Sequence, residues 1–236
     1  MRKYISKFIF ALFIVSTGVL NLSAQKVFMT GDSHVFSKIY PDTVEEIIRT
    51  RHPDMVFDWW AKNGICFHHF NIYPEYFDSI FAFQPEILLV HLGTNGAYNN
   101  AFSRQKFRKD MEDFYSTLTD SLPEVKVVFV TPFTNKKRKF RKKGKLRINY
   151  KNREVADEII AFSKEHPDTF VIDNNEEVGM RYLKSPSLIR HDYVHLTEAG
   201  YKDLGNLVGK KMLLLEDLWT KSQENISELQ ALIYAD

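Results

Sequence analysis

Five short apolar runs, separated by segments long enough for helices, constrain the fold of this chain more than any other feature. They are KVFM (26–29), MVFDWWA (55–61), EILLVHL (86–92), KVVFVT (126–131) and TFVID (169–173). Each run is nearly continuous in apolar residues, which is typical of strands that are covered on both faces, as in a parallel sheet. The runs therefore predict five strands of one parallel sheet.

The segments between these runs have the pattern of helices, over residues 40–51, 102–121, 150–164 and 197–215. Parallel neighbours need crossover connections, so an alternation of strand and helix predicts an open α/β sandwich. The commonest winding of five such strands is flavodoxin-like, in the order 2-1-3-4-5. We therefore predict a three-layer α/β sandwich around a five-stranded parallel sheet.

The first 24 residues differ in kind from the rest. MRKYISK is short and basic, FIFALFIVSTGVL (8–20) is apolar and uncharged, and Ala24 is a small residue behind which a signal peptidase can cut. This is the pattern of a secretory signal, and the apolar run is short for a transmembrane helix. We expect residues 1–24 to be a signal peptide and residues 25–215 to form one domain in a bacterial periplasm or at the cell surface. The alternative is an uncleaved N-terminal anchor.

The composition fits a globular domain without disulfides. Hydrophobic residues make up 44% and charged residues 26% of the chain. The 32 Lys and Arg include three within the first 24 residues, so 29 remain against 30 Asp and Glu, and the net basicity belongs to the expected signal. The single cysteine, Cys66, cannot form an internal disulfide. The domain must therefore rely on its hydrophobic core, which this length allows.

Two segments stand outside the alternation of strand and helix. Residues 136–147, KKRKFRKKGKLR, contain nine basic residues and no acidic one. Clustered Lys and Arg can neutralise phosphates, but an exported protein rarely meets DNA, so we expect no nucleic-acid partner. The segment is either a solvated loop or a loop that attracts an anionic envelope polymer. Residues 216–236 are expected to form a helical extension on the same domain, with a partner surface as the alternative.

The residues that follow the first three apolar runs are the informative ones, because ligands of an open α/β sheet lie beyond the carboxyl ends of its strands. Ser33, in TGDSHVF, follows the first run, Gly64 follows the second, and Gly93-Thr94-Asn95 follows the third. We expect these three loops to meet at one edge of the sheet.

A base for Ser33 is available near the end of the chain. A serine hydroxyl is a poor nucleophile until a base takes its proton, and that base is usually a histidine held by a carboxylate. Asp192 and His195 are three residues apart, just before a helix that we expect Thr197 to cap. A loop can bring both side chains to one side, provided that the last helix returns beside the first strand. The alternatives are a turn serine, a capping Asp and a surface His.

Attack on an acyl carbon also needs hydrogen-bond donors where the oxyanion develops, each contributing on the order of 3 kcal/mol. The candidates are the backbone N–H groups of Ser33 and Gly64 and the side-chain amide of Asn95. Gly64 has no Cβ, which lets a substrate approach the backbone closely. Asp32 is adjacent to the candidate nucleophile and cannot reach the far side of the imidazole, so we expect it to hydrogen-bond within its own turn.

These residues carry a family resemblance. Gly31-Asp32-Ser33, Gly64, Gly93-Thr94-Asn95 and Asp192-x-x-His195 resemble the four blocks of the SGNH, or GDSL-type, hydrolase family, over about residues 26–213. The resemblance implies a flavodoxin-like sandwich that hydrolyses esters through an acyl-enzyme, without metal or other cofactor. It implies Ser33 as nucleophile and oxyanion donor, Gly64 and Asn95 as further donors, His195 as the base and Asp192 as its orienting residue.

Two positions depart from the family pattern. His34 replaces the Leu or Ile usual after the nucleophile, and Gly96 replaces the acid often found after Gly-Thr-Asn. We expect both to reshape the floor of the pocket. The candidate substrate-binding residues are His34, Thr94, Gly96 and His191. These blocks resemble, more loosely, those of cell-envelope carbohydrate esterases, including peptidoglycan O-acetylesterases.

The predicted function is that of an exported serine esterase acting on O-acyl, and best O-acetyl, esters of a cell-envelope carbohydrate. Its expected partner is an O-acylated carbohydrate or small ester, with no stable membrane span after signal removal. The alternatives are a lysophospholipase or thioesterase with a long acyl pocket, an O-acetyltransferase, and a non-catalytic carbohydrate-binding protein. No metal site is predicted, because the spacing of the histidines at 68, 69, 91 and 191 matches no paired-ligand motif.

Overall fold

The computed structural model describes residues 25–98, 102–133, 140–142, 145–147, 151–175, 177–192 and 194–220. The expected signal peptide, residues 1–24, lies outside the described residues, and so do residues 221–236 of the expected C-terminal extension. The first residues of that extension, 216–220, continue the last helix. In the described part of the chain, no helix is long and apolar enough to cross a membrane.

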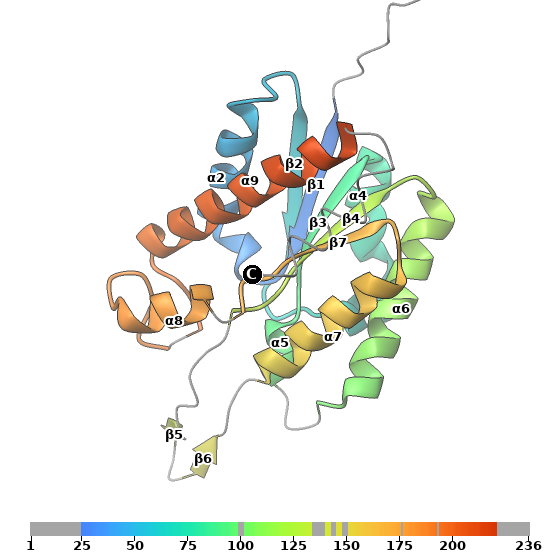
Figure 1. The fold of residues 1–236 in the computed structure, drawn as a ribbon. Coiled ribbons are helices and arrows are strands. Elements are labelled where there is room, and N and C mark those ends of the chain that lie inside the picture. The colour runs from blue at the N-terminus through green and yellow to red at the C-terminus, as the bar shows by residue number, and fades with distance from the viewer. Residues whose placement is uncertain are drawn as a thin grey trace, which may run out of the picture.

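A five-stranded parallel sheet in the order β2-β1-β3-β4-β7 forms the centre of the fold (Figure 1). Its strands are β1 (Lys26–Gly31), β2 (Val56–Ala61), β3 (Ile87–His91), β4 (Lys126–Val130) and β7 (Thr169–Ile172). Counted along the five strands of this sheet, the order is 2-1-3-4-5, so the predicted fold class and winding are confirmed. β1 pairs on both sides, with Val27 opposite Phe57 of β2 and Ile87 of β3.

The four predicted helices correspond to α2 (Ile39–Arg49), α6 (Arg104–Ser121), α7 (Asn152–Glu165) and α9 (Glu198–Thr220). Six shorter helical segments of the described residues were not predicted, because most of them span too few residues to show a helical period. They are η1 (Val35–Ser37), α3 (Phe67–Ile72), η2 (Pro74–Phe77), α4 (Asp78–Phe83), α5 (Thr94–Tyr98) and α8 (Glu177–Lys184).

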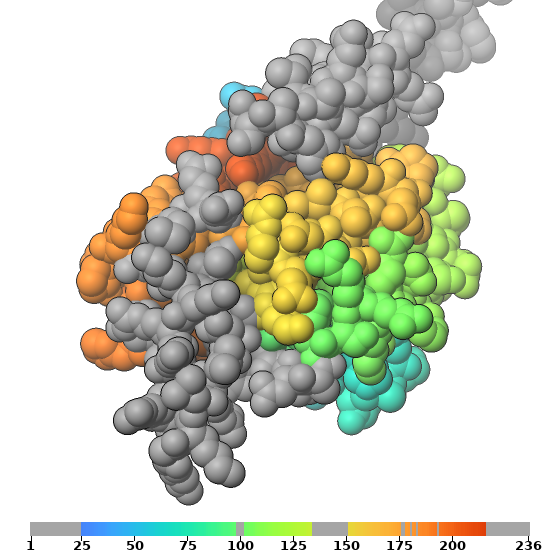
Figure 2. Space-filling view, turned by 60° about the horizontal axis from the view of Figure 1, so that its bottom comes forward, coloured from blue at the N-terminus to red at the C-terminus, as the bar shows by residue number. Residues whose placement is uncertain are grey.

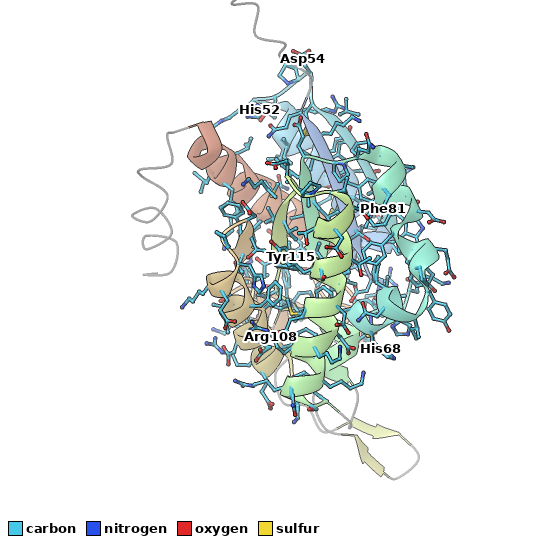
Figure 3. All side chains as sticks on the ribbon, turned by 90° about the vertical axis from the view of Figure 1, so that its right-hand side faces the viewer. His52, Asp54, His68, Phe81, Arg108 and Tyr115 are labelled. Carbon is cyan, nitrogen blue, oxygen red and sulfur yellow. The ribbon has the colours of Figure 1, made fainter. Side chains whose placement is uncertain are left out.

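Helices cover both faces of the sheet. Val27 and Met29 of β1 belong to one apolar cluster with residues of α2, α8 and α9, whereas Phe28 belongs to a second cluster with α3, α4, α6 and α7. Figure 3 faces the second layer and shows α6 in front, with Arg108 and Tyr115 along it. Burial on both faces explains the continuous apolar runs. The edge strand β2 is the exception, because its side chains are exposed or half-buried.

The last helix returns beside the first strand. This is the condition under which Asp192 and His195, which precede that helix, can reach Ser33. α9 packs along α2, which directly follows the Ser33 turn. Two glycines on α9 allow this approach: a Cβ on Gly205 would lie 2.6 Å from the Cβ of Thr43, and one on Gly209 would lie 2.8 Å from the Cβ of Ile47. This packing brings the segment before α9 to the carboxyl end of β1.

The basic segment 136–147 is described in part, as an antiparallel hairpin of β5 (Phe140–Lys142) and β6 (Lys145–Arg147). Figure 1 draws this hairpin at the same end of the molecule as α5, which follows the carboxyl end of β3. Figure 2 is turned to bring this end forward and shows α7 (yellow) beside α6 (green). An ion pair between Arg108 and Glu158 joins these two helices. Attraction of an anionic polymer by the hairpin stays a prediction.

Candidate active site

Ser33 lies in the turn between β1 and η1, at the carboxyl end of the sheet. Hydrogen bonds anchor this turn to both neighbouring strands. The N–H of Asp32 donates to the carbonyl of His91 at 3.3 Å, and the carbonyl of Gly31 accepts from the N–H of Lys62 at 3.2 Å. The N–H of Phe36 then donates to the carbonyl of Asp32 at 3.0 Å and closes the turn. The side chain of Ser33 is left half-buried at the edge of the sheet.

His195 connects Ser33 to Asp192, although 162 residues separate it from the serine. Its Nε2 atom lies 3.0 Å from Ser33 Oγ, and its Nδ1 atom lies 2.7 Å from Asp192 Oδ2. The other carboxylate oxygen, Asp192 Oδ1, accepts the N–H groups of Val194 and His195, both at 2.9 Å. Partial burial raises the pKa of Asp192, but the hydrogen bonds from His195 and these two N–H groups outweigh it and hold the pKa below its ordinary value. An ionised carboxylate is thus fixed against the imidazole.

The loop that carries His195 is held at both of its ends. An antiparallel bridge pairs Ile189 with Leu196, and the N–H of Arg190 donates to the carbonyl of His195 at 2.8 Å. Thr197 Oγ1 accepts the N–H of Gly200 at 3.2 Å, so the predicted cap of the last helix is confirmed. These contacts fix where the imidazole can lie relative to α9.

Asp32 does not contact His195; its carboxylate points into the protein. The residue is fully buried, and its Oδ1 and Oδ2 atoms accept the N–H of His34 at 3.0 Å and the amide of Asn95 at 3.1 Å. Burial raises the pKa of Asp32 to about 7, because these two hydrogen bonds offset only part of the desolvation. The expectation that Asp32 hydrogen-bonds within its own turn is confirmed.

Gly64 and Asn95, the other candidate oxyanion donors, are held in different ways. Gly64 adopts a φ of +80°, and no atom lies within 4 Å of the position that a Cβ would occupy. Its backbone conformation therefore favours glycine, and the space beside it is open. The amide nitrogen of Asn95 donates to Asp32 Oδ2 at 3.1 Å and to the carbonyl of Ile65 at 3.0 Å. Both amide hydrogens thus have acceptors within the protein, so an oxyanion would have to share one of them.

The family model of the GDSL-like lipase/acylhydrolases matches residues 35–202, about 70% of the chain. The chain belongs to this family. Its chemistry is therefore that of a carboxylic ester hydrolase. The match begins two residues after Ser33 and includes Gly64, Asn95, Asp192 and His195.

Solved structures share the fold of this acylhydrolase. A peptidoglycan O-acetylesterase superposes with a TM-score of 0.69 at 10% identity, over 81% of this chain and 91% of that one. An acetyl xylan esterase gives a TM-score of 0.61 at 17% identity, over 79% and 98%. An acetylxylan esterase from Geobacillus stearothermophilus, a catalytic mutant, gives 0.60 at 14%, over 80% and 94%. No curated protein sequence matches the chain. At these identities the likeness shows the fold.

His34 of this acylhydrolase lies beneath the site and does not line it. The residue has no exposed surface, and its ring lies 5.4 Å from that of His91 and 5.9 Å from that of His195, measured between centroids. The prediction that His34 forms part of the substrate pocket is therefore wrong, because the turn directs the imidazole into the core. Burial lowers the pKa of His34 well below its ordinary value and that of His91 to about 3. Both rings are neutral at physiological pH.

The remaining candidate substrate-binding residues occupy three different environments. Thr94, the first residue of α5, is buried, whereas His191 is exposed in the loop before His195. Gly96 lines a cavity of about 220 Å³ together with Gly64 and Asn95. Of these three residues, Gly96 is therefore the one that lines the same cavity as Gly64 and Asn95.

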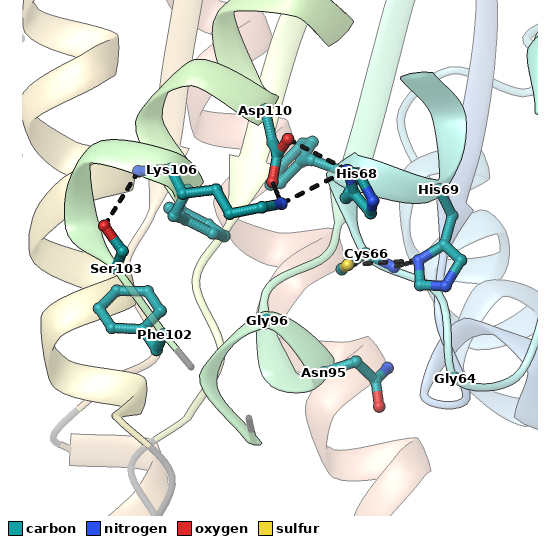
Figure 4. A pocket seen from close by; sticks show the side chains of 12 residues that line it. Gly64, Cys66, His68, His69, Asn95, Gly96, Phe102, Ser103, Lys106 and Asp110 are labelled. Atoms are coloured by element: carbon teal, nitrogen blue, oxygen red, sulfur yellow. Dashed lines mark hydrogen bonds and ion pairs between the residues drawn. The ribbon is translucent and has the colours of Figure 1, made fainter. Parts of the chain in front are cut away.

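Figure 4 shows this cavity and a polar group on its wall, formed by His68, Lys106 and Asp110. Sequence reasoning missed Lys106 and Asp110, because nothing near them on α6 indicates that they meet His68 of α3. In Figure 3, His68 lies beside α6, at the end of the molecule opposite His52 and Asp54 of the loop before β2. Among the described residues, no three His, Cys, Asp or Glu side chains are grouped so that they could hold a metal ion.

Proposed function

We propose that this acylhydrolase is a serine esterase that removes O-acyl, and preferentially O-acetyl, groups from a cell-envelope carbohydrate. The observation that carries the proposal is the hydrogen-bonded chain from Ser33 Oγ through His195 to Asp192. An imidazole placed between a hydroxyl and a carboxylate can take the hydroxyl proton and remain oriented while it does so. Ser33 is the nucleophile in this proposal, His195 the base and Asp192 the orienting residue.

The first half of the reaction forms an acyl-enzyme. Ser33 Oγ attacks the carbonyl carbon of the ester while His195 Nε2 takes its proton, which gives a tetrahedral oxyanion. Asp192 stabilises the resulting imidazolium through Nδ1–H. The neutral rings of His34 and His91 lie below without adding positive charge. When the intermediate collapses, the C–O bond to the sugar breaks, and the sugar oxygen takes the proton from His195.

The second half repeats these steps with water. Water attacks the acyl carbon of acyl-Ser33 and gives its proton to His195 Nε2, and collapse then releases the carboxylic acid and returns the proton to Ser33. The balance is one ester and one water converted to one alcohol and one acid. If a sugar hydroxyl replaces water in this step, the acyl group is transferred to that sugar, and the protein acts as an O-acetyltransferase.

The proposed oxyanion donors are the N–H groups of Ser33 and Gly64 and the amide of Asn95. The two acceptors of the Asn95 amide fix its position before substrate arrives. A donor that needs no reorganisation stabilises the developing charge most effectively. The oxyanion shares a hydrogen that Asn95 otherwise gives to Asp32 or Ile65.

Two features support a carbohydrate ester as the substrate. The similar structures include a peptidoglycan O-acetylesterase and acetyl xylan esterases. In addition, the cavity beside Gly64 and Asn95 carries charged side chains, which suit a polar leaving group better than a long acyl chain. Both features favour a short acyl group and a sugar alcohol.

The substrate class is tested with 4-nitrophenyl esters of two to twelve carbons, followed by O-acetylated xylan and O-acetylated peptidoglycan. The proposal predicts the highest kcat/KM for acetate and release of acetate from at least one of the two polymers. A maximum at long chains would instead identify a lysophospholipase or thioesterase. Turnover only in the presence of an added sugar acceptor would identify a transferase, and polymer binding without any turnover would identify a binding protein.

We also propose that residues 1–24 direct export to the bacterial envelope. The support is the basic stretch, the apolar run and the small residue Ala24 in the sequence. Expression of the full chain in a bacterium, with N-terminal sequencing of the periplasmic fraction, is expected to give a protein that starts at Gln25. Recovery of the uncut chain in the membrane fraction would contradict a cleaved signal.

A further inference from the structure

The cavity of about 220 Å³ lies next to the proposed oxyanion site, but its lining includes neither Ser33 nor His195. Gly64, Asn95 and Gly96 form one side of it (Figure 4). The side chains opposite them come from α3 and from the N-terminal end of α6. A part of the substrate adjacent to the reacting ester, and not the ester itself, is therefore what this cavity can hold.

One wall of the cavity is a hydrogen-bonded group of three polar side chains. Lys106 Nζ lies 3.1 Å from Asp110 Oδ2, and His68 Nδ1 lies 3.3 Å from Asp110 Oδ1. The side chain of Asp110 is only 16% exposed, whereas those of Lys106 and His68 are 58% and 45% exposed. Asp110 therefore fixes the two outer groups from beneath. The ammonium group, with three donors, and the second ring nitrogen of His68 keep hydrogen-bonding capacity for a ligand.

The other wall is aromatic. Phe102 is half-buried, and its ring centroid lies 5.9 Å from that of the buried Phe107. In Figure 4, Phe102 and Ser103 lie across the cavity from Cys66 and His69. Ser103 caps α6 by accepting the N–H of Lys106 at 3.3 Å, so the aromatic and polar walls are fixed relative to each other. An aromatic surface beside fixed hydrogen-bonding groups matches a sugar, which has C–H faces and hydroxyl edges.

A long acyl chain fits this cavity poorly. It would displace water from Lys106 and Asp110 and offer no hydrogen bonds in return, which costs free energy. The volume also lies below the roughly 300–1,000 Å³ of sites that hold drug-sized ligands, so one ring fits better than an extended chain.

We propose that this cavity is a subsite for one sugar residue of the carbohydrate that carries the ester. Lys106 donates a hydrogen bond to an oxygen of the sugar, and His68 Nε2 accepts one from a sugar hydroxyl while Nδ1–H donates to Asp110. Asp110 holds both groups in place, and Phe102 packs against a face of the ring. The subsite makes the enzyme selective for the alcohol part of the ester, and it rests on the proposed function.

The chain offers a matched pair of variants for a kinetic test. Lys106 pairs with Asp110 on α6, and Lys109 forms an ion pair of the same i,i+4 spacing with Asp113 on that helix, outside the cavity lining. The substrates are O-acetylated xylotriose, O-acetylated chitotriose and 4-nitrophenyl acetate, which has no sugar. Lys106→Met is expected to lower the ratio of kcat/KM on an acetylated trisaccharide to that on 4-nitrophenyl acetate about tenfold, as the loss of a charged hydrogen bond predicts. Lys109→Met is expected to leave this ratio unchanged.

Cys66 gives a second measurement that does not depend on turnover. It is the single cysteine of the chain, lines the cavity and is half-buried. Its alkylation by iodoacetamide can therefore be followed by mass spectrometry in the Ser33→Ala protein. Xylotriose or chitotriose is expected to slow this alkylation at least fivefold, whereas dodecanoate is expected to have no effect.

The outcomes separate the subsite from the function on which it rests. If the wild type hydrolyses 4-nitrophenyl acetate no faster than Ser33→Ala does, the proposed function is contradicted. Normal hydrolysis of that ester, with an unchanged ratio in Lys106→Met and no protection of Cys66 by either trisaccharide, contradicts the subsite alone. Protection of Cys66 by dodecanoate in place of the sugars also contradicts it and assigns the cavity to an acyl chain.

Discussion

His195 Nε2 lies 3.0 Å from Ser33 Oγ, and the contact joins the two ends of the domain. Ser33 sits on the turn after the first strand, whereas His195 immediately precedes the last helix. The packing of α9 on α2 holds these two loops together, and the bridge between Ile189 and Leu196 closes the loop that carries His195. The tertiary fold therefore brings the proposed nucleophile and base together. The base and its carboxylate, in contrast, are held against each other within a single loop.

Replacing Asp192 with Asn tests the role of the carboxylate. An amide keeps the size of the side chain but cannot stabilise an imidazolium at Nδ1 as a carboxylate does. We expect kcat on 4-nitrophenyl acetate to fall by roughly 10²–10⁴-fold with little change in KM, by analogy with the corresponding change in serine proteases. The control is Asp113→Asn, which changes an exposed carboxylate on α6. A kcat within twofold of the wild-type value would exclude Asp192 from the reaction.

Replacing Asn95 with Ala tests the third oxyanion donor. The side chain lies against Asp32 and Ile65, so its removal also takes away two internal hydrogen bonds. If the amide stabilises the transition state, kcat falls by roughly 10²–10³-fold while binding of a product sugar is retained. Asn206→Ala, which removes an amide bonded to the carbonyl of Lys202 on α9, is the control. A drop in melting temperature without a drop in kcat would show a structural role only.

The raised pKa of the buried Asp32 carboxyl makes the stability of the folded protein depend on pH. Its pKa is about 7 in the folded protein and 3.8 as its ordinary value, which we take for the unfolded chain. Between these values the unfolded chain has released the proton and the folded protein still holds it, so stability falls as the pH rises from about 4 to 7. The contribution that is lost amounts to about 4 kcal/mol and is complete above pH 7.

Urea denaturation of the wild type and of Asp32→Asn at a series of pH values measures this effect. The free energy of unfolding of the wild type is expected to decline more steeply between pH 4 and 7 than that of the variant, by a slope equivalent to one proton. Asp42→Asn, which changes an exposed residue of α2, is expected to keep the wild-type slope. Parallel curves for the wild type and Asp32→Asn would show that the buried carboxyl does not titrate with a raised pKa.

The sequence predicts the sheet well because the signal for each strand lies in a few consecutive residues. Each central strand is a continuous apolar run, and the parallel winding follows from the crossover helices. Asp192 and His195 are also predictable together, because they are three positions apart in one loop. Ser33 is predictable as their partner only through the order of the blocks along the chain.

The environment of His34 and the polar wall of the cavity could not be predicted in this way. The burial of His34 depends on Phe133 and Tyr201, whose rings lie 5.1 and 6.1 Å from its ring and come from distant parts of the sequence. Asp110 and His68 are 42 residues apart on separate helices, and neither helix pattern indicates which faces meet. These features arise from tertiary packing, which residue periodicity does not encode.

The most direct test of Ser33 as the nucleophile is the rate of 4-nitrophenyl acetate hydrolysis by the wild type, Ser33→Ala and Ser37→Ala. Ser37 lies four residues after Ser33, on η1, and its hydroxyl accepts the N–H of Tyr40, so it is a nearby serine whose hydroxyl has a structural partner. Ser33→Ala is expected to lose at least 10³-fold in kcat, whereas Ser37→Ala is expected to stay within about twofold of the wild type. Retention of more than a tenth of the wild-type kcat by folded Ser33→Ala would contradict Ser33 as the nucleophile.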